Sequence, residues 1–176
     1  MAILPYGRQP ENGVMVHAWR YLDPQGAPID LIESAASFFQ KTYYQISKTG
    51  EVQPLALPRD ADIVGYIAGQ LVVQLKSAWH RANQSYPAGS LIAVKLNKGT
   101  LGAAQCLITP TARQAIESVE TTRRYIIANL LDNVSGSLHV SGSRCQKRVR
   151  PCFPYNGTDR RRAACGLKPR TYHSAP

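Results

Sequence analysis

The chain has 176 residues, of which 44% are hydrophobic and 18% charged, with a formal net charge of +10 at pH 7. This is enough apolar material for one domain with a sizeable core. No apolar run approaches the roughly 20 residues that a membrane-spanning helix needs, which argues against a helical membrane protein.

The first half of the chain reads as short strands separated by turn residues. Residues 14–19 form a mixed apolar run, and the sequence Asp-Pro-Gln-Gly at 23–26 is a strong hairpin signal. Residues 29–32 and 38–46 are expected to be strands, followed by a turn in which Gly50 takes a positive φ. Residues 51–57 contain Pro54 and end before Pro58, which favours an edge strand.

The second half continues the same pattern. Residues 63–67 and 71–75 flank Gly69, and a hydrophilic connection at 79–89 leads into a strand at 91–96. Further strands are expected at 106–108, 115–119 and 125–131. Residues 111–120 also fit a helix, because four of their apolar residues are spaced by three and four. We favour a strand there, because 115–119 aligns with 63–67 in the repeat described next.

A motif recurs along the chain. Residues 69–94 contain GQLVVQLKSAW followed by GSLIAV, and residues 123–140 contain RRYIIANLLDN followed by VSGSLHV. In each copy an apolar strand runs into a polar turn, and a Gly-Ser-Leu tripeptide begins at Gly89 or Gly136. The two glycines are 47 residues apart, which is a period typical of a propeller blade or a solenoid unit.

Short strands at regular spacing with no long helix between them predict an all-β, antiparallel fold. At about four strands and 40 to 50 residues per blade, residues 12–140 amount to two to three blades of an incomplete β-propeller. Without the repeat, a β-sandwich would rank first.

Residues 27–140 resemble the N-terminal β-propeller domain of bacterial prolyl oligopeptidase family serine peptidases. The resemblance rests on DLIESAASFFQKTYYQI, LALPRDADIVGYIAGQLVVQLKSAW, YPAGSLIAV and IESVETTRRYIIANLLDNVSGSLHV, in that order. It implies a propeller that caps an α/β-hydrolase domain and admits peptides while excluding folded proteins. The partners that it implies for the parent protein are therefore a hydrolase domain and peptide substrates.

The resemblance carries no catalytic residue onto this chain, because the family's nucleophile lies in the hydrolase domain and no G-x-S-x-G motif is present. Ser137 and His139 lie two positions apart, but a triad also needs a third group and an oxyanion hole, so Ser137 is interpreted as a turn residue. His17 and His80 are explained by packing or exposure. We therefore expect no catalytic, cofactor-binding or metal-binding residue, no cofactor, and no enzymatic activity.

Residues 141–176 differ from the rest. They carry 9 Lys and Arg against 1 Asp, whereas residues 1–140 carry 12 against 10 Asp and Glu. Cys145, Cys152 and Cys165 are separated by six and twelve residues, without the close ligand pairs of a structural zinc site. The family resemblance also stops at about Val140. We interpret 141–176 as a disordered basic tail produced by a shifted reading frame.

The function predicted from these observations is a non-catalytic fragment of a substrate-gating propeller. The alternative is a small β-protein whose basic arm, including the 160–162 Arg run, binds nucleic acid or an anionic surface. A third possibility is a free-standing β-protein that binds a partner through its sheet edges. For the fragment we expect self-association through open sheet edges and no membrane partner. Pro5, Arg8 and Glu11 interrupt any secretion signal, so the compartment is open, with the cytoplasm as default.

Overall fold

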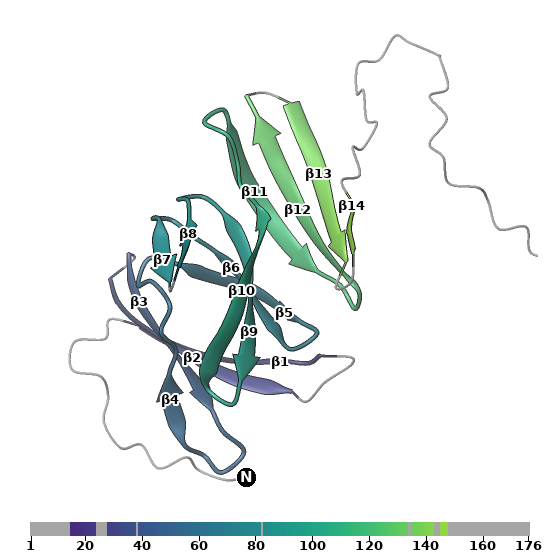
Figure 1. Cartoon of the computed structure of the whole chain (residues 1–176). Helices are drawn as coiled ribbons and strands as arrows, with labels where there is room; N and C mark the ends of the chain where they lie inside the picture. Colours follow the sequence, from purple (N-terminus) through teal and green to yellow (C-terminus); the bar gives the residue numbers. More distant parts are fainter. Residues whose placement is uncertain are drawn as a thin grey trace, which may run out of the picture.

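The computed structural model describes residues 15–23, 28–37, 39–81, 83–133, 135–142 and 145–147. All regular elements in these ranges are β-strands (Figure 1). They are β1 (Met15–Tyr21), β2 (Ile29–Ser37), β3 (Gln40–Ile46), β4 (Val52–Pro54), β5 (Asp62–Ile67), β6 (Gln70–Gln74), β7 (Trp79–Arg81), β8 (Gln84–Tyr86), β9 (Leu91–Asn97), β10 (Thr100–Ile108), β11 (Gln114–Thr121), β12 (Tyr125–Asp132), β13 (Ser135–Gly142) and β14 (Cys145–Lys147).

The strands form three antiparallel sheets of four strands each. The first sheet has the order β1-β2-β3-β4, the second β5-β6-β9-β10 and the third β11-β12-β13-β14. The strands β7 and β8 form a separate hairpin inserted between β6 and β9. Within the described ranges no sheet closes into a barrel. The expected all-β antiparallel fold is confirmed, and the three sheets are consistent with blades of an incomplete propeller.

The repeat seen in the sequence corresponds to equivalent strands. The strands β5, β6 and β9 are the first three of the second sheet, and β11, β12 and β13 are the first three of the third. A register shift falls between Ile63 and Gly65 in β5 and between Ile116 and Ser118 in β11, so the first strand of each sheet carries a bulge. The two segments are equivalent strands, but the bulge in β11 comes one residue later than the alignment of 115–119 with 63–67 gives.

The Gly-Ser-Leu tripeptides, however, do not occupy equivalent positions. Gly89 lies in the turn before β9 with a φ of 78°, whereas Gly136 lies inside β13 and pairs with Leu131. The connection between β6 and β9 holds the β7–β8 hairpin, whereas β12 and β13 are joined directly by a tight turn at Asn133. The inserted hairpin changes the length of the connection, so the tripeptides match in sequence but not in register.

Individual segments agree with most of the sequence-based expectations. The region 111–120 contributes to strand β11 rather than to a helix. β4 is an edge strand of the first sheet and ends at Pro54, and Gly50 has a φ of 87°. β2 runs through Ser37, five residues beyond the strand expected at 29–32. The connection at 79–89 is not plain loop, because it contains the hairpin.

The third sheet continues past the expected boundary at residue 140. β13 extends to Gly142, and β14 pairs its residues Cys145 and Lys147 with Gly142 and Val140. The remainder of the expected tail, including Cys152, Cys165 and the Arg run at 160–162, lies outside the described residues. Its predicted disorder and its shifted reading frame stay predictions.

Two hairpins turn through residues with positive φ. Ala68 and Gly69 have φ values of 49° and 75° between β5 and β6, and Lys98 and Gly99 have values of 44° and 83° between β9 and β10. Two-residue loops of this kind match the right-handed twist of the strands that they join. Ala68 adopts a conformation that L-residues with a Cβ rarely populate, so this turn is under mild strain.

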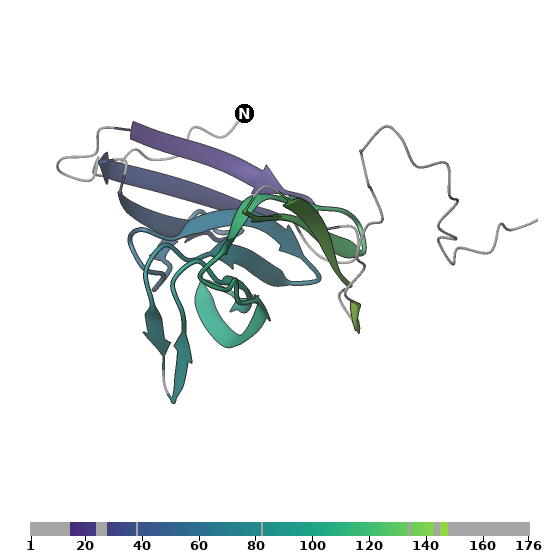
Figure 2. The same ribbon diagram turned by 90° about the horizontal axis from the view of Figure 1, so that it is seen from above.

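The sheets stack face to face around two apolar cores. The first core lies between the first and second sheets and includes Leu31, Tyr43, Leu71 and Ile92. The second core lies between the second and third sheets and includes Val72, Leu91, Ala128 and Leu130. Alternate residues of β6 and β9 thus enter different cores, and the second sheet is covered on both faces (Figure 2).

The first strands of successive sheets lie against one another. The rings of Tyr21 in β1 and Tyr66 in β5 are 6.3 Å apart between centroids. β5 in turn contacts β11, where a Cβ added to Gly65 would overlap the Cγ2 of Thr121. Gly65 is therefore required by a close approach between two sheets. The arrangement places β1, β5 and β11 along one inner side of the stack, as in the blades of a propeller.

Candidate functional site

The residues weighed for catalysis from the sequence lie on three strands. Ser137 and His139 are both in β13, and the Ser137 hydroxyl donates a hydrogen bond of 3.5 Å to the carbonyl oxygen of Leu130. His17 lies on β1 and His80 on β7, and both are exposed. The structure does not bring His17 or His80 together with Ser137. The expectation that none of them is catalytic stays a prediction.

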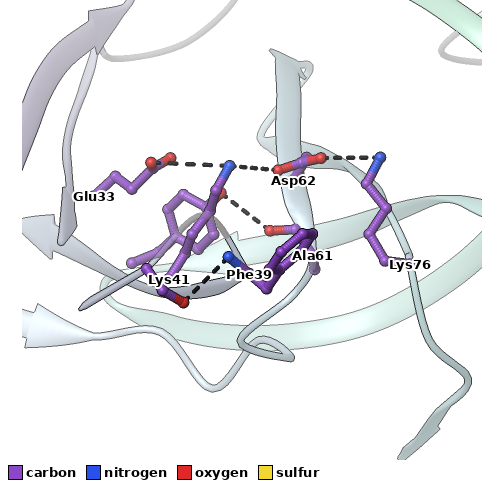
Figure 3. Close-up of polar contacts among 8 residues, drawn as sticks. Glu33, Phe39, Lys41, Ala61, Asp62 and Lys76 are labelled. Carbon is purple, nitrogen blue, oxygen red and sulfur yellow. Dashed lines mark hydrogen bonds and ion pairs between the residues drawn. The ribbon is translucent and has the colours of Figure 1, made fainter. Parts of the chain in front are cut away.

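A cluster of four charged side chains connects the first and second sheets. Lys41 Nζ lies 2.6 Å from Asp62 Oδ1 and 3.9 Å from Glu33 Oε1, and Lys76 Nζ lies 3.2 Å from Asp62 Oδ2 (Figure 3). Glu33 is on β2, Lys41 on β3 and Asp62 on β5, whereas Lys76 follows β6. We call these four residues the charge cluster.

The charge cluster lies beside the first core. Tyr43 is only 2% exposed, and its hydroxyl donates a hydrogen bond of 3.1 Å to the carbonyl oxygen of Ala61. The backbone N–H of Lys41 also donates to the carbonyl oxygen of Arg59 at 2.7 Å. Burial, reinforced by the negative charge of Glu33, raises the pKa of Tyr43 well above its usual value. Tyr43 therefore stays a neutral hydrogen-bond donor and fixes the chain segment that leads into β5.

The electrostatics of the charge cluster oppose acid–base catalysis. Burial by itself lowers the pKa of Lys41, but the hydrogen bond and charge of Asp62 outweigh it, so the pKa is raised. Burial likewise raises the pKa of Asp62, but Lys41 and Lys76 outweigh it, so the pKa is lowered. Both groups are thus held in their charged forms at neutral pH, away from the pKa near 7 that a general acid or base needs. The cluster fastens two sheets together.

The β7–β8 hairpin provides a second polar arrangement, and it projects from the body of the second sheet (Figure 2). Arg81 donates hydrogen bonds to the carbonyl oxygens of Leu101 and Gly102, and Tyr86 donates one of 2.9 Å to that of Ala104. These three acceptors belong to β10, the outer edge strand of the second sheet. Arg81 also lies over the ring of Trp79, 5.5 Å from its centroid. The hairpin therefore covers part of an edge strand with side-chain donors.

A shallow hollow of about 400 Å³ lies between this hairpin and β10. Tyr86, Pro87, Gln105, Cys106 and Thr109 contribute to its lining, and Cys106 Sγ lies 3.1 Å from Thr109 Oγ1. The described residues that line it include no carboxylate, histidine or lysine. The hollow can hold a small group by contact and hydrogen bonding, but it offers no acid–base pair.

No group of three or more His, Cys, Asp or Glu residues that could hold a metal ion is found among the described residues. The described part of the chain also contains no helix that is long and apolar enough to cross a membrane. Of the cysteines considered for a metal site, only Cys145 is in a described strand, and Cys152 and Cys165 lie outside the described ranges.

Sequence reasoning missed both polar arrangements. Glu33 falls between Leu31 and Ala35 at an inward-facing position of β2, but the strand expected from the sequence ended at residue 32. Strict alternation over the longer strand is the signal that would have found Glu33. The contact between Lys41 and Asp62 depends on how the first and second sheets stack. No local pattern shows the stacking.

Comparison with solved structures shows a likeness in fold. The chain resembles the solved structure of a post-proline cleaving enzyme from Rickettsia typhi, with a TM-score of 0.73 and 23% sequence identity over 84% of this chain. The match spans 23% of that enzyme, so the chain corresponds to less than a quarter of its length. No family model and no curated protein matches the sequence. At this level of identity the likeness shows a shared fold.

Proposed function

We propose that this chain is part of the non-catalytic β-propeller domain of a prolyl oligopeptidase-type serine peptidase, in which the propeller limits access to a separate hydrolase domain. The observation that carries the proposal is the stack of three equivalent sheets that matches part of a post-proline cleaving enzyme over 84% of the chain. The family motifs in residues 27–140 support it independently, because they extend over strands of all three sheets.

The chemistry of the described residues agrees with a structural role for this chain. The charge cluster holds its lysine and aspartate ionised, and the Ser137 hydroxyl is directed to a backbone carbonyl. Neither arrangement provides an activated nucleophile. The basic-arm alternative depends on residues outside the described ranges, and no contact in the structure favours it.

The proposal is tested by two measurements on the chain and its gene. The purified chain should not hydrolyse a chromogenic prolyl peptide, and inhibitor-sensitive turnover that co-purifies with it would contradict the proposal. The DNA downstream of the codon for about residue 140, translated in the two other frames, should encode further four-stranded repeats and then a hydrolase with a G-x-S-x-G motif. Its absence from both frames would remove the reason for expecting a longer peptidase.

A further inference from the structure

The stack of sheets ends in two apolar faces that no described residue covers. On the third sheet, Tyr125 and Leu131 are 50% and 38% exposed, although they alternate with the buried residues of β12. Ile127 lies on the same outer face and pairs with Val140 of β13. We call this the third-sheet face. The hydrogen bond of 2.7 Å from Asn129 to Glu117 engages polar groups at this face.

The first sheet ends the stack on the other side. Val16 and Val52 are 53% and 52% exposed, and Ile32, Tyr44 and Ile46 share their face through the pairs Ile32–Tyr44 and Ile46–Val52. We call this the first-sheet face. Its charges are paired, because Arg20 donates hydrogen bonds of 2.6 and 2.8 Å to Asp30. Both terminal faces therefore carry apolar side chains, and the third-sheet face also carries the carboxylates of Glu117 and Glu120.

The two terminal faces are also opposite halves of one repeating interface. In the second sheet, Val73 packs into the core shared with the first sheet and Val72 into the core shared with the third. Each internal interface thus joins the face that one sheet turns towards the following sheet to the face that the following sheet turns back towards it. The third-sheet face is the side on which a following sheet would pack, and the first-sheet face is the side on which a preceding sheet would pack. Packing one on the other therefore repeats the kind of interface already present in the chain.

Sheet edges offer less for association than these faces. Arg81 and Tyr86 already donate to three carbonyls on the β10 edge, and β4 carries Pro54, which has no N–H to give. Self-association through open sheet edges stays a prediction, and the two terminal faces offer a second route for association.

We propose that these faces bind a second copy of this chain, head to tail, with each third-sheet face on the first-sheet face of the other copy. Two copies form two identical interfaces and close a ring of six sheets, which is within the four to eight blades of known propellers. Closure leaves no terminal face exposed, which limits the assembly to two copies. The inference rests on the stacking of the sheets alone and does not depend on the proposed peptidase context.

The test uses the full chain and three single substitutions. Leu131→Asp places a charge on the third-sheet face, and Val16→Asp places one on the first-sheet face. Phe39→Asp is the matched control, because Phe39 is 81% exposed and lies in the turn between β2 and β3, outside the strands that form the two faces. Light scattering coupled to size-exclusion chromatography measures the mass of each protein, and circular dichroism checks its strand content.

The wild type and Phe39→Asp should both have twice the chain mass of 19.4 kDa. Leu131→Asp and Val16→Asp should each have the mass of one chain, because both interfaces of a closed pair contain the altered face. An equimolar mixture of these two variants should regain pairs, because it can form one unaltered interface.

Three results would overturn the proposal. A wild type with the mass of one chain rules out the pair, and a mass that grows beyond two copies with concentration rules out closure. Loss of pairing in only one face variant would indicate that this face packs on the same face of the second chain, not on the opposite terminal face. If either variant loses its strand content, Tyr125→Asp and Val52→Asp test the same faces, and unfolding of all four would contradict the exposure of these faces in one chain.

Discussion

The second sheet and the third sheet have the same strand order but different environments. In β9 of the second sheet, the four residues Leu91–Val94 are all buried, whereas in β12 of the third sheet buried and exposed residues alternate. The difference arises because the second sheet has a neighbour on each face and the third has one described neighbour only. Continuous apolar runs thus mark an inner blade, and alternating runs mark a terminal one.

The largest expected effect compares two leucines, each on the second strand of its sheet, in different environments. Leu71→Ala removes a fully buried side chain of the second sheet and should lower the free energy of unfolding by about 2 to 5 kcal/mol. Leu131→Ala on the third-sheet face should lower it by about 0.5 kcal/mol or less. Urea denaturation, at a concentration where the chain is a single copy, measures both. Equal losses would show that the third sheet is packed on both faces.

A second substitution acts where the second and third sheets approach each other most closely. Gly65→Ala should lower the free energy of unfolding by about 1 to 3 kcal/mol, because the new Cβ overlaps the Thr121 side chain. Thr121→Ser removes the overlapping methyl group, so the double variant should recover part of the loss. Purely additive effects of the two substitutions would mean that β5 and β11 are not in contact.

The charge cluster should contribute about 1 kcal/mol to the packing of the first sheet on the second, because its side chains are partly exposed. Asp62→Asn should lower the free energy of unfolding by about this amount at pH 7. Asp30→Asn is the control, because it breaks a pair within one sheet whose arginine is 61% exposed, and it should have a smaller effect.

The effect of Asp62→Asn should depend on pH with a defined sign. The pKa of Asp62 is lower in the folded chain than in the unfolded chain, so the unfolded state binds more protons at acidic pH. Its stabilisation is present above the unfolded pKa of about 3.9 and is lost as the pH falls through the folded pKa. The wild type and Asp62→Asn should therefore converge in urea titrations at acidic pH. A difference that persists at low pH would contradict the assigned ion pairs.

The smallest effect concerns the turn between β5 and β6. Ala68→Gly should raise the free energy of unfolding by about 0.5 kcal/mol, because glycine adopts the φ of 49° without steric cost. Gly69→Ala at the neighbouring position, with a φ of 75°, should lower it by about 1 kcal/mol. Thermal unfolding measures both changes. Stabilisation by Gly69→Ala would show that the turn has a different conformation.

Local patterns carried the fold class and most of the strands. The apolar run around Leu71 and Val73, which follows the turn at Gly69, predicts β6 because alternation and turn chemistry act within a few residues. The same patterns left the number of blades at two to three, and they aligned Gly89 with Gly136 although Gly89 precedes β9 and Gly136 lies inside β13. Nothing in a local window could show that an inserted hairpin lengthens one connection.

The candidate site was less accessible to sequence reasoning than the fold. The charge cluster joins residues 33, 41, 62 and 76, and its contacts exist only because two sheets pack against each other. The same holds for Arg81 and Tyr86, whose partners on β10 are some 20 residues away in the chain. The strand expected at 29–32 ended before Glu33, so neither its position in β2 nor its partner was predicted.

The central claim is that three four-stranded sheets stack in chain order with their first strands side by side. A nuclear Overhauser spectrum of the full chain tests it most directly. It should show cross-peaks between the Gly65 α-protons and the Thr121 methyl group, and between the rings of Tyr21 and Tyr66. A spectrum that shows the strand pairings within each sheet but lacks both of these contacts would contradict the stacked arrangement.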